Sequence, residues 1–210
     1  MSYSIEKVVV GTMETNCYIV KDKTTGDAAV IDPGDNAIMI QDALHRMDAK
    51  MRVILLTHGH FDHILAVGDL RDHRVPVCIH HADASMLTER DLFSTMIPHD
   101  PRPFDPADIV FEKEGKYTVG GMTFFLLPTP GHTKGSVSYA FDDNLFTGDA
   151  LFRGAVGTLQ FGGNEQDMGR TLKMFCSLPG DYTIYPGHYG KTTLSDELDT
   201  NPFLQPYKRK

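Results

Sequence analysis

The sequence predicts an α/β fold: an α/β/β/α sandwich in which two mixed β-sheets pack face to face, with helices on their outer faces. Three observations predict it. Short strand-like segments rich in Val, Ile, Phe and Tyr recur, and helical patterns lie between some of them. The alternation of strand-like and helical segments in the first half of the chain is repeated in the second half. The 210 residues can bury a sizeable core, so we expect a single domain over residues 1–210.

The expected strands are short and mostly apolar. They cover residues 7–10, 17–21, 28–31, 53–57, 75–79, 123–127, 136–141 and 182–185. The first three follow one another without a helical pattern between them. We therefore expect an opening meander, after which strands and helices alternate.

Four helices are expected between the later strands. The first covers residues 36–47, with Asn36 as its N-cap, and one of its faces carries Ala37, Ile40, Leu44 and Met47. The others cover about 62–70, 82–90 and 166–177. Helices at these positions would cover the outer faces of the sheets.

Residues 88–106 interrupt the alternation of strands and helices. The segment contains Pro98, Pro101, Pro103 and Pro106, together with the apolar residues Leu92, Phe93, Met96 and Ile97. It is either a surface excursion with a small apolar cluster of its own or a lid over a functional site, since long loops often serve as lids. The lid interpretation predicts that its apolar side chains line or cover the site.

Composition and charge exclude several classes of function. The formal net charge of −8 argues against binding to nucleic acid, because contacts to phosphates need clustered Lys and Arg. Three widely spaced cysteines without a CxxC pair indicate a reduced, cytoplasmic compartment. No signal peptide and no apolar stretch of membrane-spanning length is visible, so no membrane partner is expected.

The segment Thr57–His63 is the most informative part of the sequence. It follows the apolar run Val53–Leu56 directly and carries four potential metal ligands, His58, His60, Asp62 and His63. This order indicates a buried strand that ends in a turn, where side chains can converge on one point. Imidazole and carboxylate are ligands that zinc, iron and manganese accept. One such histidine would be an ordinary surface or capping residue, but this spacing predicts a metal site.

Three later segments repeat one design, in which an apolar strand leads into a tight turn that bears a ligand. These segments are Phe124–His132, Leu145–Asp149 and Tyr182–His188. In each of them a glycine directly precedes the ligand, where the backbone needs unusual dihedrals or a close approach. Further histidines are weaker candidates: His80 and His81 follow an expected strand, and His45, His73 and His99 are expected on the surface.

With these segments the chain resembles the metallo-β-lactamase-fold hydrolases of the glyoxalase II-like branch, in particular its shorter, single-domain members. The matching pieces follow the family's order: Ile31–Gly34, Thr57–His63, Pro130–Thr133, Thr147–Asp149 and Tyr185–His188. The resemblance covers nearly the whole chain. It is specific for the superfamily and weak for the substrate, because the same ligands serve many reactions.

The resemblance implies a site for two divalent metal ions, commonly zinc, with iron or manganese as alternatives. The ligands that it implies are His58, His60 and His132 for the first metal, Asp62, His63 and His188 for the second, and Asp149 as the bridge. Asp62 and Asp149 are then the catalytic carboxylates and act as ligands. Asp32 is expected to bond turn amides or the residues behind the ligands.

The implied reaction is hydrolysis of a small thioester of the hydroxyacylglutathione type, by hydroxide formed between the two metals. One departure concerns the substrate. Where relatives usually place a basic residue after Gly157, this chain has Thr158, which cannot pair with a carboxylate of glutathione. The basic residues that could substitute are Lys134, Arg153, Arg170 and Lys191.

Three other functions are alternatives for a chain of this fold. A sulfur dioxygenase of this fold would hold one iron with His58, His132 and Asp149, so metal content separates it from a two-metal hydrolase. A nuclease is disfavoured by the net charge of −8. A non-enzymatic or redox module is disfavoured because all seven ligand positions are occupied and flavodiiron-type relatives typically carry Glu at the position of His60.

Overall fold

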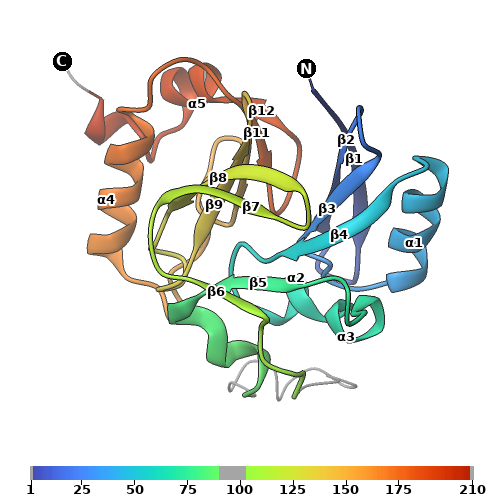
Figure 1. Cartoon of the computed structure of the whole chain (residues 1–210). Coiled ribbons are helices and arrows are strands. Elements are labelled where there is room, and N and C mark those ends of the chain that lie inside the picture. The colour runs from blue at the N-terminus through green and yellow to red at the C-terminus, as the bar shows by residue number, and fades with distance from the viewer. Residues whose placement is uncertain (1, 90–102, 209–210) are drawn as a thin grey trace.

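Two six-stranded sheets form the centre of the molecule in the computed structural model, which describes residues 2–89 and 103–208 (Figure 1). The first sheet has the strand order β1-β2-β3-β4-β5-β6. Its strands are β1 (Tyr3–Val10), β2 (Thr15–Asp22), β3 (Asp27–Ile31), β4 (Lys50–Leu55), β5 (Val77–His80) and β6 (Ile109–Phe111). The pairs β1–β2 and β2–β3 are antiparallel, which is the predicted meander, and the strands from β3 to β6 are parallel.

The second sheet has the strand order β12-β11-β10-β9-β8-β7. Its strands are β7 (Gly115–Val119), β8 (Met122–Pro128), β9 (Val137–Phe141), β10 (Asn144–Gly148), β11 (Thr183–Pro186) and β12 (Thr192–Thr193). Neighbours from β7 to β10 are antiparallel, and β10 is parallel to β11. The strands β8, β10 and β11 therefore run in one direction, and their carboxyl ends lie at the same edge of the sheet.

Helices cover the outer face of each sheet (Figure 1). Beside the first sheet lie α1 (Ala37–Arg46), α2 (Phe61–Ile64), α3 (Val67–Leu70) and the 3₁₀ helix η1 (His81–Leu87). Beside the second lie α4 (Glu165–Phe175), α5 (Leu194–Thr200) and the 3₁₀ helix η3 (Gln205–Tyr207). This arrangement confirms the predicted α/β/β/α sandwich.

The alternation of side chains along the strands builds three apolar layers. In β4, Val53 and Leu55 point into the interface between the sheets, where they join the core that contains Phe124 and Phe141. Ile54, between them, points to the opposite face and joins the layer under α1 and α3. A third layer packs α4 and α5 on the second sheet. The strand ends that carry the ligands are thus fixed by a core on both faces of each sheet.

Several element assignments differ from the sequence-based expectation. The helix expected over 62–70 is divided, because the Ala66 amide donates to the Pro33 carbonyl and not to the preceding turn. Asn36 precedes α1 but its side chain does not cap the helix; its Oδ1 accepts from the Gly11 amide at 2.9 Å. The segment expected as a helix over 82–90 forms η1.

Candidate metal centre

The structure brings all seven sequence-predicted ligands to one place, where the carboxyl ends of strands from both sheets meet. His58 and His60 lie in the loop after β4, and Asp62 and His63 lie on α2. The other three follow strands of the second sheet: His132 after β8, Asp149 after β10 and His188 after β11. Residues 58 and 188, which are far apart in the sequence, therefore contribute to one cluster.

Two groups of ligand atoms can be distinguished. His58, His60 and His132 form the first half-site, and their ligand atoms lie within 4.8 Å of one another. Asp62, His63 and His188 form the second half-site at the same spacing. In the second, Asp62 Oδ2 lies 3.4 Å from His63 Nε2 and 3.3 Å from His188 Nε2.

Asp149 lies between the two half-sites. Its Oδ2 is 3.5 Å from Nε2 of His132, a member of the first half-site. The same oxygen is 3.6 Å from His188 Nε2, and Oδ1 is 3.4 Å from His63 Nε2, so the carboxylate also faces the second half-site. One carboxylate group in contact with both sets of histidines has the position that a bridging ligand requires.

Hydrogen bonds outside the cluster fix the histidine tautomers of the first half-site. His132 Nδ1 donates to the Thr158 carbonyl at 2.7 Å, and His60 Nε2 donates to the Phe161 carbonyl at 3.1 Å. A carbonyl can only accept, so in the neutral imidazoles the other two nitrogens carry lone pairs. These are His60 Nδ1 and His132 Nε2, which face each other at 2.8 Å. Two lone pairs at this separation repel each other unless a cation lies beside them.

The remaining inward-facing atoms also fit a cation. His63 Nδ1 donates to Asp32 Oδ2 at 2.9 Å, which leaves its Nε2 directed inward. Within the described part of the chain, His58 Nε2, His63 Nε2 and Asp149 Oδ1 are buried without a hydrogen-bond partner. Buried polar atoms without a partner are costly, and metal ions bind to such nitrogens and oxygens once any proton on them is displaced. The donor set therefore fits divalent metals, although the role of each residue as a ligand stays a prediction.

Asp32 supports the site from behind. Its Oδ1 accepts from the Thr57 amide at 2.7 Å, and its Oδ2 accepts from the Thr57 hydroxyl at 2.6 Å. That hydroxyl in turn accepts from His58 Nδ1 at 3.1 Å. With His63 also bound, the carboxylate orients one histidine of each half-site. The expectation that Asp32 bonds turn amides and the residues behind the ligands agrees with this geometry.

The two half-sites differ in electrostatics. Burial lowers the pKa of His58 and of His132, which keeps both imidazoles neutral at pH 7. Burial also acts to lower the pKa of His63, but the carboxylates of Asp62, Asp149 and Asp32 outweigh it and raise the pKa to about 10. The pKa of His188 is raised against the effect of burial by the same carboxylates, Asp62 and Asp149. A cation must therefore displace protons from the second half-site when it binds there.

Asp83, on η1, is a buried residue of the site that the sequence analysis missed. Its Oδ2 accepts from the Gly59 amide at 3.2 Å and from the Thr133 hydroxyl at 2.6 Å, while its Oδ1 accepts from the Gly135 amide at 2.8 Å. Gly59 separates His58 from His60, and Thr133 follows His132. One carboxylate therefore fastens both loops of the first half-site. A single Asp outside any motif gives no signal of this role in the sequence.

We expect Asp83→Ala to weaken metal binding at the first half-site and to destabilise the fold by roughly 2–4 kcal/mol, because two buried amides lose their acceptor. Metal content after dialysis and urea unfolding would measure the two effects. The matched control is Asp42→Ala, since Asp42 is exposed on α1. Equal metal content and stability in both variants would contradict the assigned role.

A cleft of about 760 Å³ opens beside Asp149 and His188. Its walls come from the β1–β2 hairpin, from the loop after β11 and from Phe152, Ala155, Val156 and Thr158. Lys7 is the basic residue among them, and the lining contains none of the four basic residues considered as substitutes for a family contact (Lys134, Arg153, Arg170 and Lys191). The apolar residues 92–97 of the expected lid lie outside the described residues.

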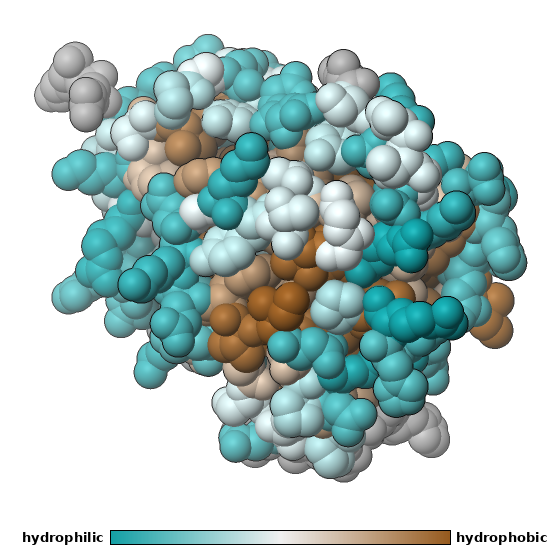
Figure 2. Space-filling model, in the orientation of Figure 1, coloured by the Kyte–Doolittle hydropathy of each residue, from teal (hydrophilic) through white to brown (hydrophobic). Residues whose placement is uncertain are grey.

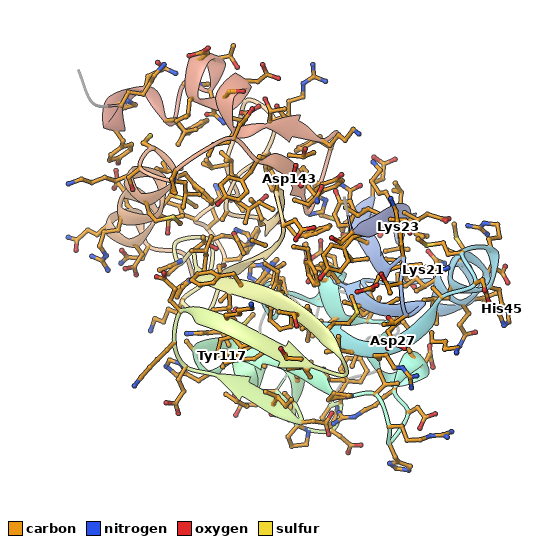
Figure 3. All side chains as sticks on the ribbon, turned by 45° about the horizontal axis from the view of Figure 1, so that its top comes forward. Lys21, Lys23, Asp27, His45, Tyr117 and Asp143 are labelled. Carbon is orange, nitrogen blue, oxygen red and sulfur yellow. The ribbon has the colours of Figure 1, made fainter. Side chains whose placement is uncertain are left out.

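The weaker histidine candidates take no part in the cluster. His80 is the N-cap of η1 and accepts from the Ala82 amide at 3.4 Å. His45 and His73 are exposed, as expected, and Figure 3 shows His45 on the outer side of α1, at the edge of the molecule. His99 lies outside the described residues.

Comparison with known proteins gives the family. The family model of the metallo-beta-lactamase superfamily matches residues 10–188, a span that contains all seven clustered residues. This chain belongs to the metallo-beta-lactamase superfamily. The superfamily's metallo-hydrolases include similar proteins: a probable metallo-hydrolase of Streptococcus pyogenes is 35% identical over 91% of this chain and 85% of its own length. The hydroxyacylglutathione hydrolase GloC of Haemophilus influenzae is 31% identical over 96% of this chain and 98% of its own.

Solved structures of this superfamily are similar over nearly the whole chain. The B3 metallo-beta-lactamase BLEG-1 has a TM-score of 0.87 at 33% identity and covers 96% of this chain and 99% of its own. The di-iron-bound form of TTHA1623 has a TM-score of 0.79 at 34% identity and covers 95% and 100%. The cluster of His and Asp side chains in the present chain, a metallo-hydrolase of this superfamily, is thus consistent with a dinuclear metal site.

In residues 2–89 and 103–208, no helix is long and apolar enough to span a membrane.

Proposed function

We propose that this chain is a dinuclear metallo-hydrolase that cleaves a small thioester of the hydroxyacylglutathione type. The observation that carries the proposal is the position of Asp149, whose carboxylate faces His132 on one side and His63 and His188 on the other. A shared carboxylate with three further candidate ligands on each side suits two cations that act together on one carbonyl. The printed name of GloC supports the thioester as the substrate class.

The chain's own residues would hold the two ions and orient the substrate. His58, His60 and His132 would hold one ion and Asp62, His63 and His188 the other, with Asp149 shared. When bound, such ions ionise water near neutral pH and stabilise negative charge on a carbonyl oxygen. The Thr15 hydroxyl donates to Asp62 Oδ2 at 2.9 Å and fixes the direction of that carboxylate. Because the cleft opens at Asp149 and His188, a thioester lying in it would present its carbonyl to the ions.

The alternative is a mono-iron sulfur dioxygenase that uses His58, His132 and Asp149. The second half-site argues against it, since Asp62, His63 and His188 form a further set with ligand spacing. We expect two metal ions per chain, most often zinc, with iron or manganese as alternatives. One iron per chain, and oxygen consumption with glutathione persulfide, would move the assignment to the dioxygenase.

The reaction itself is the test. We expect metal-loaded protein to hydrolyse S-lactoylglutathione, with a rate that rises with pH near neutrality and falls to background after treatment with a chelator. Thr158 in place of a basic residue removes one charge-assisted contact, worth about 1.5–3 kcal/mol, so KM should exceed that of full-length glyoxalase II. Release of free thiol from S-lactoylglutathione checks the proposal, with a β-lactam as a comparison substrate and single-stranded RNA as a binding probe. Protein with two metals that is inert to several thioesters would contradict it.

A further inference from the structure

The β1–β2 hairpin forms one wall of the cleft beside the metal centre. Val8 and Val10 of β1 are buried in the core, so the alternation of the strand turns Lys7 and Val9 outward, toward the cleft. The apolar side chain of Met13 continues this wall at the tip of the hairpin. This wall thus offers an apolar surface that carries one amino group.

Beside this wall, the cleft contains an exposed aromatic residue held in an unusual backbone conformation. Tyr189 directly follows His188 and has a φ of 66°, a left-handed conformation that is rare for a bulky residue. Its carbonyl accepts from Asn16 Nδ2 at 2.9 Å and from Lys7 Nζ at 3.4 Å. Tyr189 is 68% exposed, and its ring lies edge-on to the Phe152 ring, with the centroids 5.6 Å apart. The hairpin thus holds this aromatic ring at the edge of the cleft, next to a candidate metal ligand.

The cleft has few charged groups besides the metal-centre residues Asp149 and His188. Among its lining residues these are Lys7 and Glu14, both exposed. A lysine has three donors, and the contact recorded for Lys7 in the described residues is the long one to the Tyr189 carbonyl. Two donors of Lys7 therefore remain for a further acceptor. Lys7 supplies one positive charge, and Glu14 on the same cleft offsets part of it. A carrier with a single carboxylate needs no more than one lysine, whereas a carrier with several phosphates needs clustered basic residues.

Thr158 cannot provide this recognition. It lines the same cleft, but its side chain is a neutral hydroxyl and its carbonyl accepts from His132 Nδ1. Among the described residues that line the cleft, Lys7 is the cationic side chain outside the metal centre that could pair with a negatively charged thiol carrier. Lys7 contacts the carbonyl of Tyr189, the residue that directly follows the candidate ligand His188, although Lys7 and His188 are far apart in the sequence.

We infer that Lys7 is the specificity-determining residue that binds a carboxylate of the thiol carrier, while the apolar part of the carrier lies against Tyr189 and Val9. This inference rests on the proposed thioester hydrolysis. It assigns a peptide-like thiol with a free carboxylate as the carrier, in place of a neutral or a phosphorylated thiol. The thioester group would then face His188 and Asp149 at the inner end of the same cleft.

The experiment compares one acyl group on three carriers, using metal-loaded protein. The substrates are lactoyl thioesters of glutathione, of the neutral thiol N-acetylcysteamine and of coenzyme A. For Lys7→Gln we expect KM for the glutathione thioester to rise roughly five- to tenfold, kcat to stay within about twofold, and the neutral thioester to be unaffected. Lys7→Arg should restore most of the loss, and added salt should raise KM of the wild type more than that of Lys7→Gln.

The matched control is Lys116→Gln, which removes the same charge from an exposed position of β7, at the edge strand of the second sheet. Equal KM values for wild type and Lys7→Gln, or a preference for the coenzyme A thioester, would overturn the inference. If wild type hydrolyses none of the three, the proposed function fails. Calorimetric binding of S-methylglutathione then decides on Lys7: weaker binding to Lys7→Gln supports the carboxylate site, and equal or absent binding rejects it.

Discussion

Replacing Asp149 with alanine should remove both metal ions, because its carboxylate is the group that faces both half-sites. Its oxygens lie 3.4–3.6 Å from His63, His132 and His188, and Oδ1 is buried without a hydrogen-bond partner in the described part of the chain. Without the carboxylate, the second half-site keeps one acidic ligand and the first keeps none. We expect metal content to fall from two ions per chain to less than one, and kcat/KM to fall roughly a thousandfold or more.

Elemental analysis after dialysis measures the first effect and hydrolysis of S-lactoylglutathione the second. The control is Asp143→Ala, because Asp143 is exposed in the turn between β9 and β10 (Figure 3). Circular dichroism of both variants separates metal loss from misfolding. An Asp149→Ala protein with two ions and full activity would show that the bridging assignment is wrong.

The residues of the metal centre could be predicted because each is part of a local motif. An apolar strand, a glycine and a ligand follow one another in the sequence, and this order already places the ligand at the end of a buried strand. Gly148 shows the physical reason: its φ is 49°, and a Cβ there would lie 2.3 Å from Thr57 Oγ1. The motifs alone do not contain the pairing of the half-sites around Asp149, which depends on the packing of the two sheets; the family resemblance implied this pairing.

The residues around the metal centre could not be predicted in the same way. Lys7 lies on β1, and Tyr189 lies 182 residues later in the sequence. Asp83 lies on η1, in a segment that was expected as a helix, but its partners are backbone amides and a hydroxyl, which leave no pattern in the sequence. Neither has a characteristic spacing to the ligands, because their contacts arise from tertiary packing alone.

The fold shows a similar division between local and tertiary signals. Strand segments buried on both faces, such as Val53–Leu55 of β4, are continuous apolar runs and were expected. The strands β6 and β7 lie at the edges of their sheets and are half-exposed, so their apolar signal is weak. The helix α5 was missed because only Leu194 and Glu197 of its residues are buried. Figure 2 shows a band of hydrophobic residues among hydrophilic ones on this face of the molecule.

Replacing Gly187 with alanine should have the second largest effect, through contact with the bridging carboxylate. A Cβ at this position would lie 2.3 Å from Asp149 Oδ1 and 2.8 Å from His63 Cε1. The backbone cannot move aside easily, since the Gly187 amide donates to the Gly148 carbonyl at 2.8 Å and its carbonyl accepts from the Asn16 amide at 2.7 Å. The methyl group must therefore displace Asp149 or His63, at a cost of about 1–3 kcal/mol in packing alone.

We expect Gly187→Ala to lose the ion of the second half-site first, because the added methyl group would displace His63 and Asp149, which would both hold that ion. We also expect kcat/KM to fall roughly a hundredfold or more. The chain provides a matched control three residues later: a Cβ at Gly190 would meet nothing within 4 Å. Metal content after dialysis against a weak chelator should therefore fall in Gly187→Ala and stay at the wild-type value in Gly190→Ala. If both variants retain two ions, the close approach of Gly187 to the carboxylate has no bearing on metal binding, and the glycine before His188 serves only the turn.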